Sequence, residues 1–482
     1  MRISYALHLL GIIIIFLGLA MIAPLFISLL YKDRSSWALL KALLVTIFSG
    51  FILYFFFRGK NHRVLTHREG IGIVALGWVS AGLFGALPFF FAGTFDTFVD
   101  ALFESVSGFT TTGASVLVNI ESLPKGILFW RSLTQWLGGM GIIVLSLAIL
   151  PFLGVGGMQL YKAEIPAPVV DKLKPRISET AKLLWKVYVL ISAMEVLLLC
   201  MGGMDIFDSL CHTFDTMATG GFSTKNASIG HYKSVYFDCI IIFFMLMAGV
   251  NFSLHYQLLK GHITTFWKNP EFRFFMMLVA FFTATVTLNL YTHHFHNLPQ
   301  SLRYSAFQVC SIITTTGYTT TDFEKWPALS RSILFICMFI GASAGSTGGG
   351  IKCLRIMLLL KHSYRELFRI IHPHAVTQLK LAGKVVSAEV INSIWGFFVL
   401  YLGLFVLASF MLAAMGVDLI SSFSAVAASI GNVGPGLGIV GPAQNYSHIP
   451  YLGKWLLILC MLLGRLEIYT IIILFVPEYW KK

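Results

Sequence analysis

The chain has 482 residues, of which 57% are apolar and only 12% are charged. Soluble proteins carry about 45–50% apolar and about 25% charged residues, so this composition excludes a large soluble enzyme, a disordered chain and a disulfide scaffold. It predicts an all-α polytopic membrane protein. The net charge of +13 fits cationic loops that hold helix ends in the cytoplasm. Long basic runs interleaved with aromatic residues are absent from the sequence, so no nucleic-acid partner is expected.

Two apolar helices are predicted at the start of the chain, over residues 5–30 and 37–57. Each is long enough for a hydrocarbon core of about 30 Å, which needs about 20 helical residues. The first is too long for the apolar part of a signal peptide and lacks a small-residue cleavage site, so we expect it to be retained. The seven cysteines form no Cys-x-x-Cys pair and predict buried free thiols.

After a basic loop, the sequence repeats one unit four times: an apolar helix, a short Ser/Thr/Gly-rich segment and a second apolar helix. We expect four pseudo-repeated helix–pore loop–helix units around one pore, in addition to the N-terminal pair, with ten membrane spans. The expected divisions, an N-terminal helix pair and four pore units, are 1–70, 71–160, 161–265, 266–365 and 366–482. The expected helix, short segment and helix of each unit are 71–91, 103–115 and 126–152; 180–204, 210–223 and 235–259; 272–291, 307–320 and 330–360; and 390–415, 423–438 and 451–475.

Lysine and arginine residues decide the expected orientation, because short cytoplasmic loops are enriched in them. With the N-terminus inside, most of the 35 such residues fall on the inner side. This predicts cytoplasmic chain ends and four short segments that face outside. The inner group is made up of Arg2, the basic residues of 58–68, 162–186, 260–273 and 352–384, and Lys481 and Lys482.

Each short segment carries a glycine on which the four can be aligned: Gly113, Gly220, Gly317 and Gly434. A filter that strips water from a cation needs rings of backbone carbonyls, and glycine permits dihedrals that aim successive carbonyls at one axis. A short preceding helix points its C-terminal end at the pore, which favours a cation. Helix packing or ordinary turns would also use such residues, but four copies between paired helices favour a pore. The predicted ion-binding residues are Thr111, Thr112, Gly113, Ala218, Thr219, Gly220, Thr315, Thr316, Gly317, Asn432, Val433 and Gly434.

At these residues the sequence resembles the Trk/Ktr/HKT superfamily of potassium transporters and, within it, the bacterial Trk membrane subunits. The resemblance covers nearly the whole chain and includes the first helix pair and the run 345–352. It implies K⁺ as the transported ion, bound by the filter residues above. Gly113 supports this implication, because relatives that prefer sodium often carry serine there.

The resemblance also implies a location and partners. It places the chain in a bacterial inner membrane, surrounded by lipid, as a homodimer with one pore per protomer. It further implies a cytosolic TrkA-like regulatory ring that binds NAD(H), ATP or ADP. The sequence itself has no strand-rich segment and no placed dinucleotide fingerprint, so no nucleotide is expected on this chain.

Residues 341–350 interrupt the second helix of the third unit with five glycines, each of which costs a helix about 1 kcal/mol relative to alanine. A helix broken at mid-membrane, just inside the filter, predicts a movable gate; close packing through Gly341-x-x-x-Gly345 is the alternative. Arg465 lies inside the last span, where it either restricts cation flow or pairs with Glu467 or another acid. The predicted gate residues are Gly345, Ser346, Thr347, Gly348, Gly349, Gly350, Lys352 and Arg465.

Other charged and nucleophilic residues admit two interpretations. Arg131 is expected to be a structural anchor, and Asp215 either attracts cations to the pore mouth or caps local backbone. A proton- or sodium-coupled symporter, the alternative function, would need a titratable group in the pathway, for which Glu104 and Glu195 are candidates. Ser343 lies in a Gly-x-Ser-x-Gly pattern, but that motif needs a strand-to-helix elbow, so we expect no enzyme.

Two further groups of basic residues have weaker implications. His293, His294 and His296 lie in an expected outer loop, where solvated histidines are commoner than a metal site. The basic segments 162–186 and 352–384 could dock the regulatory ring, or could simply fix the topology.

Overall fold

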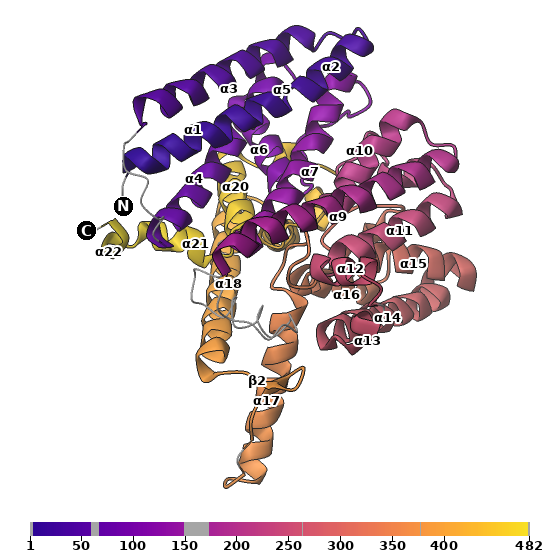
Figure 1. Ribbon diagram of the computed structural model, residues 1–482. Helices are drawn as coiled ribbons and strands as arrows, with labels where there is room; N and C mark the ends of the chain where they lie inside the picture. The colour runs from indigo at the N-terminus through magenta and orange to yellow at the C-terminus, as the bar shows by residue number, and fades with distance from the viewer. Residues whose placement is uncertain (1–2, 59–66, 149–172, 263, 376, 481–482) are drawn as a thin grey trace.

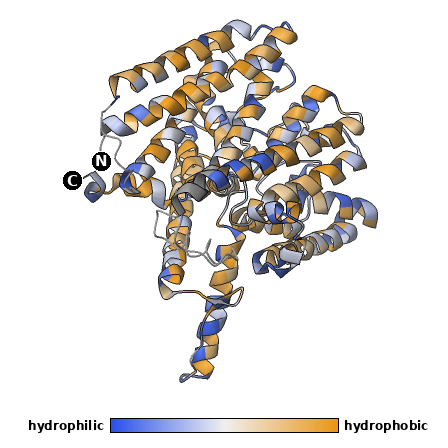
Figure 2. Ribbon diagram, viewed as in Figure 1, coloured by the Kyte–Doolittle hydropathy of each residue, from blue (hydrophilic) through white to orange (hydrophobic). Residues whose placement is uncertain are grey.

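The structure is a computed structural model that describes residues 3–58, 67–148, 173–262, 264–375 and 377–480. The described chain is predominantly helical (Figure 1), as expected for an all-α membrane protein. Apolar residues dominate most of its helices (Figure 2). Some expected features lie outside the described residues: the end of 126–152, part of 162–186, and Arg2, Lys60, Arg63, Lys481 and Lys482.

The N-terminal pair consists of α1 (Ile3–Ala20), its continuation α2 (Ile22–Leu30), and α3 (Ser36–Phe56). Glycines let α1 and α3 approach closely. A Cβ atom at Gly11 would lie 2.8 Å from the carbonyl oxygen of Gly50 on the opposite helix. Small residues at such contacts are the usual basis of helix association in a membrane, where burial of apolar surface gives little driving force.

The first pore unit contains α4 (His67–Gly85), α5 (Leu87–Phe91), α6 (Phe98–Phe109) and α7 (Lys125–Ala148). The break between α4 and α5 is at Ala86, and Pro88 lies in the first turn of α5. Proline is tolerated there because the N–H that it lacks would have no partner within the helix.

The second unit departs from the expected straight spans. The span expected over 235–259 is bent by 103° between α11 and α12. Val250 is extended at the bend, and the Asn251 side chain caps α12 by accepting a hydrogen bond from Ser253 N at 2.8 Å. The elements are α9 (Leu173–Met201), α10 (Ile206–Met217), η1 (Ser228–His231), α11 (Val235–Gly249), α12 (Phe252–Leu259) and α13 (Thr264–Lys268).

The third unit contains the break that the glycine run predicts. α16 ends at Ile340, Gly341 has a φ of 72°, and helix resumes only at Cys353. The following helix, α17, packs against α18 with its first half, and its C-terminal half projects beyond the other helices (Figure 1). The elements are α14 (Pro270–Leu290), the π-helical turn η2 (Tyr291–Phe295), α15 (Leu298–Ile313), η3 (Phe323–Lys325), α16 (Ala328–Ile340) and α17 (Cys353–Ile371).

The fourth unit begins with a small antiparallel hairpin in which Lys380 pairs with Val385. The span expected over 451–475 is bent by 112° after Arg465, where Glu467 adopts a φ of 56°. The elements are β1 (Lys380–Leu381), β2 (Lys384–Val385), α18 (Ala388–Ala414), α19 (Leu419–Ile430), η4 (Gly438–Val440), η5 (Tyr446–His448), α20 (Tyr451–Arg465), α21 (Tyr469–Ile472), η6 (Ile473–Phe475) and α22 (Pro477–Trp480).

Within the described residues, six helices are long and apolar enough to cross a membrane, or up to eight when each bent pair counts as one span. The other two of the ten expected spans are α7 and the interrupted pair α16 and α17. α7 carries polar residues and glycines in its middle, and α16 is an apolar helix of only 13 residues that the glycine run separates from α17. Each of the four expected units contains one helix of 12 to 16 residues at the expected short segment: α6, α10, α15 and α19.

Candidate ion pore

The four short helices start in the same way, with a side chain that caps the first turn. The side chain of the residue before each helix accepts a hydrogen bond from a backbone N–H of the first turn. This pairs one of the donors that a helix leaves unsatisfied at its start. The capping residues are Thr97 for α6, Asp205 for α10, Asn297 for α15 and Asp418 for α19.

The four helices also end in one common turn. In α6, Thr111 is left-handed with a φ of 52°, and Thr112 N donates a hydrogen bond to the Ser107 carbonyl at 2.8 Å. This six-to-one bond across a left-handed residue defines a Schellman motif, here with threonine or asparagine in place of the usual glycine. The equivalent left-handed residues are Thr219, Thr315 and Asn432, and the equivalent bonds, each 2.8 Å, join Gly220 to Asp215, Thr316 to Ser311 and Val433 to Ala428.

A glycine with positive φ follows two residues after each left-handed residue. These glycines are Gly113, Gly221, Gly317 and Gly434, with φ values of 80°, 72°, 82° and 99°. The sequence alignment on Gly220 is therefore wrong by one residue. Gly220 occupies the position of Thr112 and Thr316, and Gly221 is the counterpart of Gly113. Two consecutive glycines made the register ambiguous.

The strands that contain these glycines form a closed ring. A Cβ atom on Gly113 would overlap the Gly220 carbonyl oxygen, which belongs to the second strand. An added Cβ would overlap in the same way between the second and third strands, between the third and fourth, and between the fourth and first. The pairs are Gly221 with the Thr316 carbonyl, Gly317 with the Val433 carbonyl and Gly434 with the Thr112 carbonyl. Each strand thus lies against the next, and only glycine leaves room for the neighbouring carbonyl.

Side chains behind the strands fix this ring. Gln135 of α7 donates to the Gly220 carbonyl at 2.9 Å and accepts from Phe222 N at 3.2 Å. Asn432 donates to Thr112 Oγ1 at 2.9 Å and so joins the fourth strand to the first. Gln135 was not identified from the sequence. In the sequence, Gln135 is distinguished only as an uncharged polar residue within a mainly apolar helix.

Glu104 and Arg131 form a buried ion pair behind the first two strands. Arg131 Nε lies 2.6 Å from Glu104 Oε1, and the two residues are 2% and 0% exposed. Glu104 also accepts hydrogen bonds from Ser115 Oγ at 2.9 Å and from Val116 N at 3.1 Å, while Arg131 donates to the Ser223 carbonyl at 2.8 Å. Arg131 is the anchor that the sequence predicts. Glu104, a candidate for ion coupling, is engaged in the same network.

Glu104→Gln is expected to lower the free energy of unfolding by about 3–5 kcal/mol, because it leaves the Arg131 charge buried without its counterion. The measurement is the thermal melting temperature of the purified protein in detergent. Glu478→Gln, at an exposed position, is the matched control and should leave melting unchanged. An unaltered melting temperature together with uptake that loses its proton dependence would instead assign Glu104 to ion coupling.

Two further carboxylates lie behind the second strand, and both are fully buried. Asp215 Oδ2 accepts a hydrogen bond from Ser132 Oγ at 2.8 Å. The Asp215 side chain caps no backbone group among the described residues, so that interpretation was wrong. The other interpretation, attraction of cations to the pore, stays a prediction. Glu195 of α9 is buried as well, and among the described residues neither of its carboxylate oxygens has a hydrogen-bond partner.

The loop between α16 and α17 lies directly against the ends of three pore helices. Thr347 Oγ1 lies 3.0 Å from the Met217 carbonyl at the end of α10, and Gly349 N donates to Thr315 Oγ1 at 2.7 Å. A Cβ on Gly349 would overlap the Gly431 carbonyl at the end of α19. The loop is therefore seated at the end of the ring where the pore helices stop. Because its backbone is not helical, Gly341 and Gly345 do not form a helix-packing motif.

Two cationic side chains hold this loop through carbonyl oxygens. Arg465, which is 3% exposed, donates to the Thr347 carbonyl at 2.6 Å and to the Gly138 carbonyl at 3.4 Å. Lys352 Nζ donates to the Gly348 carbonyl. Glu467, the expected partner of Arg465, pairs with Arg355 instead. Among the described residues, neither Arg465 nor Lys352 forms an ion pair with a carboxylate.

The bend in the second unit supports the same loop. Phe252 N, at the start of α12, donates to the Gly345 carbonyl at 3.1 Å, and Ser343 N donates to the Gly249 carbonyl at 3.0 Å. Ser343 is thus part of a non-helical loop inside a helix bundle, with no strand-to-helix elbow. The sequence did not predict this bend. It places the Gly249 carbonyl, at the end of α11, and Phe252 N, at the start of α12, next to the loop, where both form hydrogen bonds.

The remaining candidate features lie away from the pore. His293, His294 and His296 are exposed at the end of α14, and His293 Nδ1 lies 2.6 Å from Thr292 Oγ1. In the part of the chain that the structure describes, no group of three or more His, Cys, Asp or Glu side chains is arranged to hold a metal ion. All seven cysteines are free thiols.

Comparison with known proteins gives full-length matches. A family model, TrkH, described as a cation transport protein, matches residues 35–482. The chain is 44% identical over 476 residues to the "Trk system potassium uptake protein TrkH" of Escherichia coli strain K12, with 98% of each chain covered. It is 42% identical over 485 residues to the protein of the same name from Halomonas elongata, with both chains fully covered. The crystal structure of the potassium transporter TrkH from Vibrio parahaemolyticus superposes with a TM-score of 0.92 at 40% identity, covering 100% of each chain.

Proposed function

The chain belongs to the TrkH family of cation transport proteins, and on this basis we propose that it takes up potassium ions across a bacterial inner membrane through the ring of four strands. One observation carries the proposal: the cyclic contact of each strand glycine with the preceding carbonyl of the next strand. A closed ring of backbone carbonyls is what a dehydrated cation requires. The C-terminal ends of α6, α10, α15 and α19 meet at the ring and favour positive charge there.

The proposed ion ligands are the filter residues predicted from the sequence, with Gly221 added to them. Inward movement follows the membrane potential, which contributes about 2.3 kcal/mol per charge for each 100 mV. The chain itself needs no nucleotide for this step. The relatives named above are potassium uptake proteins, which supports K⁺ as the ion.

We further propose that the loop 341–352 and Arg465 restrict flow below the filter. Three contacts support this role: Gly349 N with Thr315 Oγ1, Thr347 with the end of α10, and the guanidinium of Arg465 on the Thr347 carbonyl. A cationic group at the inner end of a cation filter raises the energy of an ion that passes it. Moving the loop would require breaking a small set of hydrogen bonds rather than unfolding a helix.

The proposed regulatory partner is a cytosolic TrkA-like nucleotide-binding ring, docked on the segment 352–384. The C-terminal half of α17 projects beyond the other helices (Figure 1), and the helix joins the gate loop directly. It carries an exposed apolar stripe, formed by Leu360, Tyr364, Leu367 and Ile371, which are 57%, 71%, 61% and 72% exposed. Such a stripe is typical of a surface that another protein covers. A homodimer and cytoplasmic chain ends complete the proposal.

The test of the transport proposal is a reversal potential in liposomes that contain the protein alone. The parent is expected to reverse near the K⁺ equilibrium potential. Gly113→Ser should abolish the discrimination between K⁺ and Na⁺ or the current itself, because its Cβ overlaps the Gly220 carbonyl. Gly93→Ser is the matched control: Gly93 also has a positive φ, of 64°, but no atom within 4 Å of an added Cβ, so its selectivity should equal that of the parent.

Two results would contradict this proposal. A reversal potential that moves with the proton or sodium gradient would establish a coupled symporter, and Glu195 would be the next residue to replace. Equal selectivity of Gly113→Ser and the parent would show that the ring is not the filter. Should the parent pass no current without its partner, removal of residues 345–350 is expected to start it; a deletion variant that stays silent would contradict the proposed gate.

A further inference from the structure

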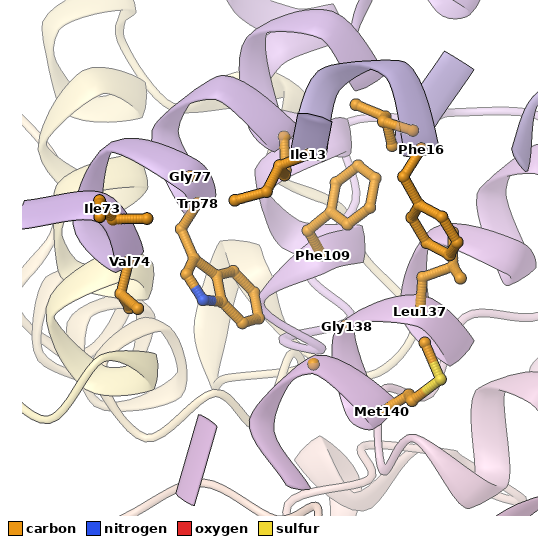
Figure 3. A pocket seen from close by; sticks show the side chains of 13 residues that line it. Ile13, Phe16, Ile73, Val74, Gly77, Trp78, Phe109, Leu137, Gly138 and Met140 are labelled. Carbon is orange, nitrogen blue, oxygen red and sulfur yellow. The ribbon is translucent and has the colours of Figure 1, made fainter. Parts of the chain in front are cut away.

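An apolar cavity of about 330 Å³ lies between the N-terminal helix pair and the first pore unit. Its walls come from α1, α4, α6 and α7, four helices that belong to the membrane-embedded part of the chain. Figure 3 shows the side chains of Ile13, Phe16, Trp78, Phe109 and Met140 around this space. The volume is in the range of small-molecule sites, about 300–1,000 Å³, and the lining is almost wholly hydrocarbon.

The cavity lies near the middle of the bilayer. The first span starts at Ser4 and the span of α4 at Arg68, so Ile13 and Gly77 are nine residues along their spans. At 1.5 Å per residue this is about 14 Å, close to half of a hydrocarbon core of about 30 Å. Lipid headgroups are far from this depth, and only the acyl chains of the lipids reach it.

The cavity also opens toward the lipid. Two of its lining residues, Ile13 and Phe16, are 38% and 57% exposed on the outer face of α1. Water is a poor occupant, because apolar cavities of this kind stay dry. A helix is too thick for the space, since its diameter is about 10–12 Å with side chains.

We propose that the cavity binds an acyl chain of a membrane lipid. A single hydrocarbon chain is thin enough to occupy the cavity, needs no hydrogen-bond partner, and is abundant at this depth. Packing contacts along its length provide the binding energy, as they do between helices in a membrane. The proposal concerns a binding site and does not rest on which ion the chain transports.

The occupied cavity would share a wall with the pore. Phe109 is the last residue of α6, directly before the turn that starts the first filter strand. A Cβ on Gly138, which also lines the cavity, would overlap the Phe109 carbonyl, and the Gly138 carbonyl accepts a hydrogen bond from Arg465. The acyl chain therefore contacts the same backbone that positions the filter turn and the proposed gate arginine.

The experiment is photo-crosslinking of the full-length protein in vesicles of phosphatidylethanolamine and phosphatidylglycerol. One phospholipid probe carries a diazirine in the middle of an acyl chain, and the other carries it in the headgroup. The mid-chain probe is expected to label peptides that contain Trp78, Phe109 or Met140. The headgroup probe is expected to leave those peptides unlabelled. Equal labelling of these peptides by both probes, or none by the mid-chain probe, would overturn the proposal.

Two glycines allow the cavity to be filled without disturbing the backbone. Added Cβ atoms at Gly77 and Gly141 would lie no closer than 3.5 Å to Ile13 and 3.6 Å to Trp78. The variant Gly77→Leu with Gly141→Leu should therefore lower mid-chain labelling by at least about fivefold, because its side chains occupy the space. Gly403→Leu, on an exposed face of α18 with no atom within 4 Å, is the control and should label like the parent. Labelling of the double variant at the parent level would contradict the proposed site. Should the double variant fail to fold, the peptides labelled in the wild-type protein by the two probes decide whether the acyl chain occupies the cavity.

Discussion

Gly221→Ala is expected to reduce potassium uptake by at least about tenfold, since the left-handed backbone alone costs an alanine about 1–2 kcal/mol and each 1.4 kcal/mol is a factor of ten. The larger part of the effect is steric. The new methyl group would overlap the carbonyl oxygen of Thr316, which belongs to the ring and cannot move without displacing the third strand. Uptake by cells that lack other potassium transporters is the measurement.

The neighbouring Gly220 supplies a matched comparison. It has no positive φ, and the three atoms nearest to a methyl group there all belong to the side chain of Gln135. Gly220→Ala should therefore be less harmful than Gly221→Ala, and Gln135→Ala should partly restore it in the double variant, a coupling that a double-mutant cycle measures. The opposite order, with Gly221→Ala tolerated and Gly220→Ala inactive, would show that the sequence alignment on Gly220 was the functional one.

Arg465→Gln is expected to raise potassium flux through the protein without its regulatory partner by at least about tenfold, equivalent to about 1.4 kcal/mol of barrier. Glutamine removes the positive charge but still can donate to the Thr347 carbonyl, so the loop keeps one anchor. At an effective dielectric constant of about 20, two like unit charges about 6 Å apart repel each other by about 3 kcal/mol. The measurement is potassium flux into liposomes.

The control for this prediction is Arg465→Lys, which keeps the charge and should keep the low flux of the parent. Melting temperatures of both variants show whether the fold is intact. Parent-level flux through a well-folded Arg465→Gln protein would mean that Arg465 only braces the loop. A gain in both variants would assign the restriction to the geometry of the guanidinium hydrogen bonds instead of to its charge.

The sequence was sufficient for the helical class, for the glycine-containing turns that follow α6, α15 and α19, and for the break after Ile340. These features depend on local composition: apolar length, glycine content and the Thr-Thr-Gly pattern. The sequence was insufficient where two adjacent residues could both fill one structural position. Gly220 and Gly221 both satisfy the requirement for a flexible residue, and only the contact with Thr316 on another strand selects Gly221.

Bends and polar partners were harder to predict for a related reason. The 103° bend after Gly249 occurs in an apolar stretch without proline, and it is stabilised by bonds to Gly345 and Ser343, nearly one hundred residues away in the chain. Arg465 has Glu467 two residues away, yet it bonds to carbonyls of Thr347 and Gly138. The helix ends at Arg465 and the chain bends at Glu467, whose φ is 56°, and Glu467 pairs with Arg355.

The cyclic contacts between strands have a consequence for how mutations can change the ring during evolution. In a channel built from four identical subunits, any filter mutation appears at all four corners at once. Here, one codon change alters one corner, and its steric effect extends first to the single strand that the altered residue touches. Under the proposed transport role, ion preference can therefore change through single substitutions, in intermediates that keep the other three strands unaltered. The departure of the fourth strand from the other three, with Asn432 and Val433 where the first has threonines, is the kind of asymmetry that such a route permits.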